Sequence, residues 1–122
     1  MTKVVFDSSF LMAVAERPTA WFEDILSSAG KFEPVLLGCV RDELQKLSLM
    51  RTKRARLARL ALGLSASFSQ AQCGGAAVDD EIVSFALSTN ALVATVDTEL
   101  RHALESSHVR VVYLKGGRVA VA

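Results

Sequence analysis

The segment VVFDSSFL, residues 4–11, joins an apolar run to a carboxylate and two serines. Its first half continues the β-branched and aromatic run that starts at Lys3, which predicts a short buried strand ending at Phe6. A helical pattern follows from Ser9, so Asp7 stands at the junction of strand and helix. There its side chain could cap the helix by accepting hydrogen bonds from free backbone amides. It could equally be a ligand or a catalytic group at the carboxyl end of a buried strand, where open α/β sheets place their sites.

The alternation of apolar strand and amphipathic helix continues along the chain. Buried strands are predicted at VLLG (35–38), ALVATV (91–96) and VRVVYL (109–114). Residues 65–77 are predicted to form a weak strand or a loop, and GGRVAVA a turn with a trailing β-segment. Helices are predicted over 20–29 with Thr19 as N-cap, from Cys39, over 51–64, from Asp79 or Asp80, and over 97–107. In the helix over 51–64, the inward face is expected to carry Leu57, Leu60, Ala61 and Leu64. This alternation predicts a parallel sheet covered by helices on both faces.

The composition is typical of one globular domain spanning residues 1–122, because 51% of the residues are hydrophobic and can form a sizeable core. The formal net charge of +1 excludes neither nucleic acids nor small molecules, since clustering of charge matters more than its total. Cys39 and Cys73 match no zinc-binding spacing, which favours two reduced thiols in an intracellular protein, with a single disulfide as the alternative. No apolar run reaches the roughly 20 residues of a membrane span, and no signal peptide precedes the first strand. We therefore expect a cytoplasmic protein.

Acidic residues follow the predicted strands at points that a parallel sheet would bring together. Asp7 follows the first strand, and Asp97 follows ALVATV. Glu43 lies about one helical turn after VLLG, while Asp79 and Asp80 begin the helix that precedes ALVATV. Because right-handed crossovers place the carboxyl ends of parallel strands along one edge, these acids are expected to share that edge.

Carboxylates that gather at one edge repel one another and raise each other's pKa values. A divalent cation removes this conflict, and oxygen ligands without nearby cysteine or histidine suit Mg²⁺ or Mn²⁺. One or two such ions can activate water and stabilise the oxygens of an in-line phosphoryl displacement. The expected chemistry is phosphodiester hydrolysis, although each aspartate taken singly can also be explained as a helix cap.

A one-sided run of basic residues begins the helix predicted over 51–64. No acidic residue occurs between Arg51 and Val78. Such a run is either the solvated face of an amphipathic helix or a surface that neutralises RNA phosphates, with an affinity that falls as salt increases. We expect RNA contact from Arg51, Lys53, Arg54, Arg56 and Arg59.

The order of these motifs resembles that of the PIN-domain ribonucleases. FDSSFL is similar to the opening Asp-Thr/Ser-Asn/Ser motif of that family, and VRDEL to its helix-borne glutamate. VDDEIVSFA is similar to the third acidic motif, and ATVDTELRHAL followed by VRVVYL to the fourth motif and the closing strand. The resemblance covers essentially the whole chain. The basic helix and VDDEIV look most like the archaeal relatives of rRNA-processing PIN nucleases, with VapC-type toxins next.

The resemblance implies a PIN-like three-layer α/β/α sandwich around a mainly parallel sheet of four to five strands. It implies a Mg²⁺- or Mn²⁺-dependent endoribonuclease acting in rRNA processing or RNA turnover. The alternatives are a VapC-type toxin ribonuclease of a toxin–antitoxin pair and a catalytically inactive RNA- or protein-binding module. The implied partners are RNA, either an antitoxin or ribosome-assembly factors, and a second copy of the chain in a homodimer, with no membrane partner.

The resemblance also assigns roles to individual residues. The implied metal ligands and catalytic residues are Asp7, Glu43, Asp79 and Asp97, supported by Ser9, Asp80 and Glu99. Ser8 and Ser9 stand where threonine and asparagine are more frequent in the family. The offsets from Ile82 favour Asp79 over Asp80 as the direct ligand.

Overall fold

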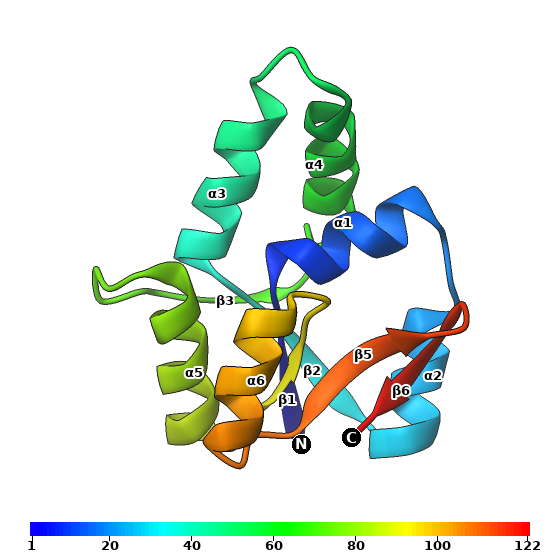
Figure 1. Ribbon diagram of the computed structural model, residues 1–122, viewed down its shortest axis with the longest axis vertical. Coiled ribbons are helices and arrows are strands. Elements are labelled where there is room, and N and C mark those ends of the chain that lie inside the picture. The colour runs from blue at the N-terminus through cyan, green and yellow to red at the C-terminus, as the bar shows by residue number, and fades with distance from the viewer.

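A six-stranded sheet runs through the centre of the computed structural model, which describes residues 1–122 (Figure 1). The strands are β1 (Thr2–Phe6), β2 (Phe32–Leu37), β3 (Ser69–Ala71), β4 (Leu92–Ala94), β5 (Val111–Lys115) and β6 (Arg118–Val121). The order is β3-β2-β1-β4-β5-β6, and every neighbouring pair is parallel except β5 and β6. The predicted mainly parallel sheet is thus confirmed. The expected four to five strands were too few, because both the weak segment within 65–77 and the trailing segment form strands.

Six helices connect the strands and complete the predicted α/β sandwich. They are α1 (Ser8–Glu16), α2 (Trp21–Ala29), α3 (Gly38–Ser48), α4 (Lys53–Leu64), α5 (Val78–Thr89) and α6 (Thr98–Ser106). The chain moves outward from β1 to β3 and then crosses back to β4 and β5, so right-handed crossovers place α1 to α4 on one face and α5 and α6 on the other. Figure 1 shows α5 and α6 side by side, and α3 and α4 as a pair that projects beyond the sheet. None of these helices is long and apolar enough to cross a membrane.

An aromatic cluster anchors the end of β1. The Phe6 side chain is fully buried, and its ring centroid lies 5.6 Å from that of Phe10, 5.4 Å from that of Trp21 and 5.0 Å from that of Phe68. These partners come from α1, from α2 and from the loop before β3, so three separate segments fix the residue directly before Asp7.

The second helix does not start as the sequence predicted. Ala20 rather than Thr19 occupies the N-cap position of α2, and the buried Thr19 hydroxyl has no hydrogen-bond partner. The helix begins at Trp21, whose ring packs against Phe6, so that packing rather than the polar cap sets the start. The predicted end is confirmed, because Gly30 follows α2 with a φ of 77°.

Helix α4 packs through alanines rather than leucines. Ala55, Ala58 and Ala61 are buried, whereas Leu60 and Leu64, which were expected to face inward, are 45% and 38% exposed. The helix is apolar on more than one side, so periodicity alone could not identify the buried face. The alanine stripe is favoured because α4 packs against both α1 and α3, and small side chains let helices approach closely.

Cys39 and Cys73 form a disulfide, so the expectation of two reduced thiols is wrong for this structure. Their Cα atoms lie 6.0 Å apart, although 34 positions separate them in the sequence. The parallel pairing of β2 with β3 brings the residues just after the two strands together, and sequence spacing does not reveal this proximity. The bond joins Cys39 in the first turn of α3 to the loop that leads into α5. Glu43 lies further along α3, and Asp79 lies near the start of α5.

We predict that replacing Cys39 and Cys73 together by serine lowers the free energy of unfolding by about 3 kcal/mol, because the unfolded chain then loses a cross-link across a loop of this length. Urea unfolding under non-reducing conditions measures the change. Reductant should destabilise the parent protein by a similar amount and leave the double variant unaffected. Equal stability of the parent and the double variant without reductant would contradict the prediction.

Candidate functional site

The strand order reverses between β1 and β4, which are neighbours at the centre of the sheet. The crossovers that follow these two strands lead to opposite faces, and such a point leaves a crevice at the carboxyl ends of the strands. Asp7 directly follows β1, and its amide donates a hydrogen bond to the carbonyl of Ala94 at the end of β4 (2.9 Å). Asp97 lies three residues beyond Ala94. The fold thus places two of the predicted site residues at this crevice.

Asp7 is buried and does not act as a helix cap. It occupies the N-cap position of α1, but its side chain makes no capping hydrogen bond, and only 5% of the residue is exposed. Its Oδ2 accepts hydrogen bonds from the hydroxyls of Ser9 and Thr95, the latter at 3.0 Å. Its Oδ1 accepts no hydrogen bond from the protein. Asp7 therefore has one oxygen that is fixed by two hydroxyls and one that is free for an external ligand.

Thr95 connects the ends of the two central strands and was not singled out by sequence reasoning. Its fully buried hydroxyl donates to Oδ2 of Asp7 and accepts from the amide of Asp97 at 3.0 Å. The one available signal was that Thr95 is the only polar residue in the predicted strand ALVATV. Burial of a hydroxyl costs free energy unless the group is hydrogen-bonded, and the Thr95 hydroxyl both donates and accepts a hydrogen bond.

Asp97 serves as the N-cap of α6, because its Oδ1 accepts a hydrogen bond from the amide of Leu100 at 3.0 Å. The cap interpretation is therefore correct for Asp97, unlike for Asp7. It does not exclude a role as a ligand, since Oδ2 of Asp97 accepts no hydrogen bond from the protein. The cap holds this carboxylate in a fixed position at the carboxyl end of β4.

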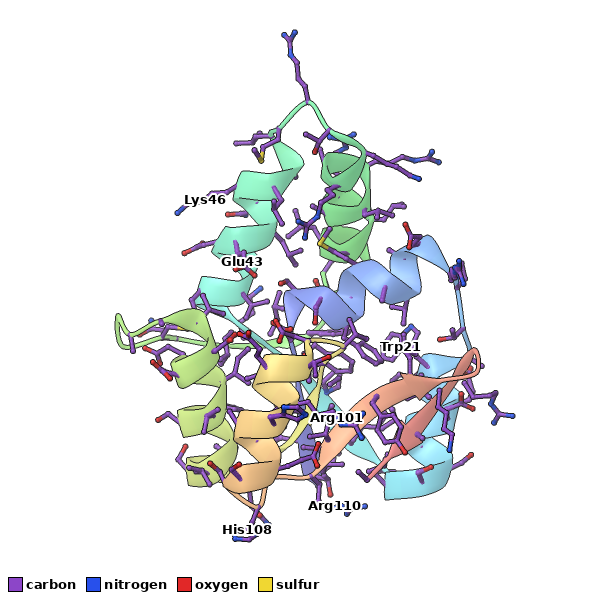
Figure 2. The ribbon with its side chains drawn as sticks, viewed as in Figure 1. Trp21, Glu43, Lys46, Arg101, His108 and Arg110 are labelled. Atoms are coloured by element: carbon purple, nitrogen blue, oxygen red, sulfur yellow. A yellow bond between two sulfur atoms is a disulfide. The ribbon has the colours of Figure 1, made fainter.

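Glu43 comes from α3, on the far side of β1 from Asp97. Its Oε1 accepts a hydrogen bond from the Ser8 hydroxyl at 2.6 Å. The two serines after Asp7 thus divide their roles, because Ser9 binds Asp7 and Ser8 binds Glu43. In Figure 2, Glu43 lies on the lower part of α3, below Lys46.

Asp79 and Asp80 both lie in the first turn of α5, and neither side chain caps that helix. Asp79 is exposed overall, but partial desolvation raises the pKa of its carboxyl group, and the charges of Asp7, Asp97, Glu43 and Asp80 raise it further. The Asp79 carboxylate thus belongs to the same electrostatic group as the other three predicted ligands.

The two remaining acids expected to support the site lie at its margin. Asp80 lines a shallow cavity between α5 and α6. Glu99 is exposed in the first turn of α6 and makes no ion pair or hydrogen bond. Asp80 nevertheless raises the pKa of the neighbouring Asp79.

The electrostatics of Asp7 differ sharply from those of a second buried aspartate, Asp24. Burial raises the pKa of Asp7, the Ser9 and Thr95 hydroxyls partly offset this, and the Glu43 and Asp97 charges raise it further. Asp24 instead pairs with Arg118 at 2.8 Å, and that guanidinium lowers its pKa. None of the four predicted ligands has a basic partner within 4.0 Å.

The model of the PIN like domain family matches residues 4–117 of the chain. The chain belongs to the PIN-like domain family. Members of this family are typically nucleases. No curated protein matches the chain in sequence.

Three solved structures share the fold of this PIN domain. The PIN domain endonuclease Utp24 superimposes with a TM-score of 0.82 at 24% identity, over 98% of this chain and 90% of that one. A PilT N-terminus domain protein from the hyperthermophilic archaeon Sulfolobus solfataricus gives 0.58 at 15% identity, over 92% and 87% of the two chains. A protein from Pyrobaculum aerophilum gives 0.52 at 20% identity, over 81% and 77%. At these identities the likeness establishes the fold.

The acidic side chains of this PIN domain stand apart as they lie in the structure. No three acidic, histidine or cysteine side chains converge closely enough to hold a metal ion without rearrangement. The donor chemistry nevertheless suits a hard divalent cation, because every candidate ligand is a carboxylate. Desolvation is the largest cause of the raised pKa values of Asp7 and Asp79, and neighbouring carboxylates raise them further, a repulsion that such an ion would relieve.

The five basic residues predicted to contact RNA lie in α4 and the loop before it, in the helix pair α3–α4 that projects beyond the sheet (Figure 1). Arg59 is held within the protein, because it donates a hydrogen bond to the carbonyl of Ser48 at 2.9 Å. The other members of the predicted set are exposed and make no ion pair or hydrogen bond: Arg51, Lys53, Arg54 and Arg56. Four of the five cations are therefore available to an anionic partner.

We predict opposite effects of neutralising the two buried aspartates. The raised pKa of Asp7 means that the folded state binds a proton more tightly than the unfolded state. This group therefore lowers the stability of the fold as the pH rises above the ordinary aspartate pKa of 3.8. Asp7→Asn should therefore raise the melting temperature near neutral pH in metal-free buffer. The pKa of Asp24 is lowered, so this group stabilises the fold at a pH above the ordinary aspartate pKa. That stabilisation is lost as the pH falls through the lowered pKa. Asp24→Asn should lower the melting temperature.

Thermal unfolding of both variants with chelator, followed across acidic and neutral pH, measures these changes. The difference between Asp7→Asn and the parent should shrink toward acidic pH, where Asp7 is protonated in the parent. A loss of stability in Asp7→Asn as large as that in Asp24→Asn would show that the Asp7 charge is already balanced within the protein.

Proposed function

We propose that this PIN domain is a Mg²⁺- or Mn²⁺-dependent endoribonuclease that acts in rRNA processing or RNA turnover. The observation that carries the proposal is the buried Asp7 carboxylate at the switch point of the sheet, which has no basic partner and whose pKa is raised by burial and further by the charges of Glu43 and Asp97. The family supports it, because its members are typically nucleases, and the structurally similar Utp24 is a PIN domain endonuclease.

Each candidate ligand offers at least one oxygen that accepts no hydrogen bond from the protein. Asp7 would contribute Oδ1, Asp97 Oδ2 and Glu43 Oε2, together with the carboxylate of Asp79. The hydroxyls of Ser9 and Thr95 would keep the Asp7 carboxylate oriented. Because the acidic side chains do not converge closely enough in the structure to hold an ion, metal binding would require them to rearrange.

A bound divalent ion would act as a Lewis acid on the phosphate and lower the pKa of water to make it a nucleophile. Hydrolysis adds water across one P–O bond of the backbone and leaves a phosphate and a hydroxyl. The contribution of the chain is to supply negative charge where the cation is needed and to fix Asp7 and Asp97 through the Thr95 hydroxyl. Buried hydrogen-bond partners of this kind typically change metal affinity or activity about 10- to 100-fold when removed.

The exposed cations at the α3–α4 tip would bind the RNA backbone. Arg51, Lys53, Arg54 and Arg56 make no ion pair within the protein and lie before or within the first turn of α4. Helix α3 also carries Glu43, so the same helix pair links this basic surface to the carboxylates. This continuity supports RNA, rather than a small phosphodiester, as the substrate.

We predict that Glu43→Gln abolishes cleavage of single-stranded RNA in Mn²⁺ or Mg²⁺, whereas Asp42→Asn leaves it unchanged. Both substitutions remove one negative charge from the same turn of α3, but only Glu43 acts on Asp7 and Asp79. Gel analysis of labelled RNA with and without chelator measures the activity. Cleavage that survives both chelation and Glu43→Gln would exclude the metal mechanism.

We predict that replacing Arg54 and Arg56 by alanine weakens RNA binding about equally for all sequences. Each lost phosphate contact should reduce the slope of log K against log salt by about 0.7 for a single strand. The affinity of the Asp7→Asn protein, measured at several salt concentrations, supplies the reference slope. An unchanged slope would show that these cations only form the solvent-exposed face of α4 and do not contact RNA phosphates.

Co-purification from the native host separates the two cellular roles open to such a nuclease. Ribosomal precursor particles bound to the protein would support rRNA processing. A small, tightly bound protein in their place would identify a toxin–antitoxin pair and overturn the rRNA-processing role.

A further inference from the structure

A cavity of about 630 Å³ adjoins the carboxylates on the side of α6 and β5. Its size falls within the range of about 300–1,000 Å³ that small-molecule sites typically have. Thr95 and Val96 form part of its wall, and these residues also hold the site, because the Thr95 hydroxyl binds Asp7 and the Val96 amide donates to Ser9 at 3.2 Å. The cavity and the carboxylates therefore share a wall.

Arg101 is held as a flat platform in this cavity. Its guanidinium carbon lies 4.3 Å from the centroid of the Tyr113 ring, and its Nε donates to Oε1 of Glu105 at 2.9 Å. One face of the guanidinium is thus covered by Tyr113, while the side chain as a whole stays 38% exposed. Figure 2 shows Arg101 reaching from α6 toward β5. Its Nη1 and Nη2 groups make no hydrogen bond within the protein.

The surroundings of Arg101 suit a base better than a phosphate. The charge of Arg101 is already balanced by Glu105, so the cavity is not a strongly cationic pocket. Its walls include the apolar side chains of Val96 and Leu114, beside the ring of Tyr113. Guanidinium planes stack on nucleobases, and unstacked bases of single-stranded RNA are recognised in this way. The free Nη groups could in addition donate to acceptors at the edge of the base.

We propose that this cavity binds one nucleobase of single-stranded RNA, stacked on Arg101, next to the phosphodiester that is cleaved. The proposal rests on the proposed nuclease function, because it places the base beside the carboxylates that would perform the chemistry. Arg101 lies one helical turn after Asp97, and its amide donates to the Asp97 carbonyl at 2.9 Å. A base on Arg101 and a phosphate at the carboxylates would therefore be close neighbours on the strand.

The test uses the Asp7→Asn protein, which the proposed function predicts to be cleavage-deficient, and a short single-stranded RNA in which 2-aminopurine replaces one base at a time. Fluorescence should be quenched most strongly at one position, where the probe stacks on Arg101. Adding Arg101→Ala should remove this quenching and weaken RNA binding about 5- to 100-fold, the range typical of one stacked base. Arg101→Lys should fail in the same way, because an ammonium group keeps the charge but has no planar face.

Arg110→Ala is the matched control, because Arg110 precedes β5 at the opposite end of the strand and bonds the carbonyl of Ala122. The Asp7→Asn protein that also carries Arg110→Ala should show the same quenching pattern as the Asp7→Asn protein alone. Unchanged quenching with Arg101→Ala, or full binding and quenching with Arg101→Lys, would overturn the base site. Melting temperatures of the Arg101 variants should stay near that of the parent, since an exposed ion pair contributes little to stability.

A parallel assay separates failure of the base site from failure of the nuclease function. With Asp7 intact, Arg101→Ala should slow Mn²⁺-dependent cleavage of RNA but not cleavage of the same RNA with an abasic residue at the position that shows the strongest quenching. Equal slowing of both substrates would overturn the base site alone. Failure of the parent protein to hydrolyse either substrate would overturn the nuclease function, whereas the quenching experiment would still decide whether a base binds Arg101.

Discussion

The arrangement of the site depends on one buried charge that no basic side chain balances. Asp7 ends the central strand β1, directly after Phe6, which three aromatic rings hold in place. Its carboxylate is bound by two hydroxyls and faces the charges of Glu43 and Asp97. An ionised carboxylate in such surroundings opposes folding unless a partner compensates it. The sheet has to be stable enough to hold this residue in place.

Asp24 shows what the same chain does with a buried aspartate that has a structural role. Arg118 and the amide of Val119 bind it, and its pKa is lowered rather than raised. The contrast separates two kinds of buried charge, one paired with a guanidinium within the fold and one without a basic partner. Functional sites commonly retain unfavourable charge in this way, and removal of the charge then stabilises the protein while activity is lost.

Much of the fold could be predicted because it follows from local sequence. Continuous apolar runs indicated the buried strands β1, β4 and β5, and the alternation with helices indicated a parallel sheet. The positions of the acids at strand ends then predicted which segments would meet at one edge. The buried face of α4 could not be predicted, because its leucines and alanines both repeat at helical spacing and only packing against α1 and α3 selects the alanines.

Other features of the site depend on contacts between residues far apart in the sequence. The disulfide of Cys39 with Cys73 requires the pairing of β2 with β3. The role of Thr95 requires β1 and β4 to be adjacent, and the platform of Arg101 on Tyr113 requires α6 to lie on β5. Sequence reasoning selected the candidate acidic ligands from residue type and position, and the family resemblance added Ser9. It missed Thr95, because a threonine in an apolar strand is common.

The central claim is that the unbalanced carboxylates bind a divalent cation. Calorimetric titration of the metal-free protein with Mn²⁺, repeated in buffers of different ionisation enthalpy, measures both the affinity and the number of protons released. Because the pKa values of Asp7 and Asp79 are raised, we expect saturable binding with proton release that grows as the pH is lowered from neutral toward these raised pKa values. Absence of saturable Mn²⁺ binding by the folded protein would contradict the account.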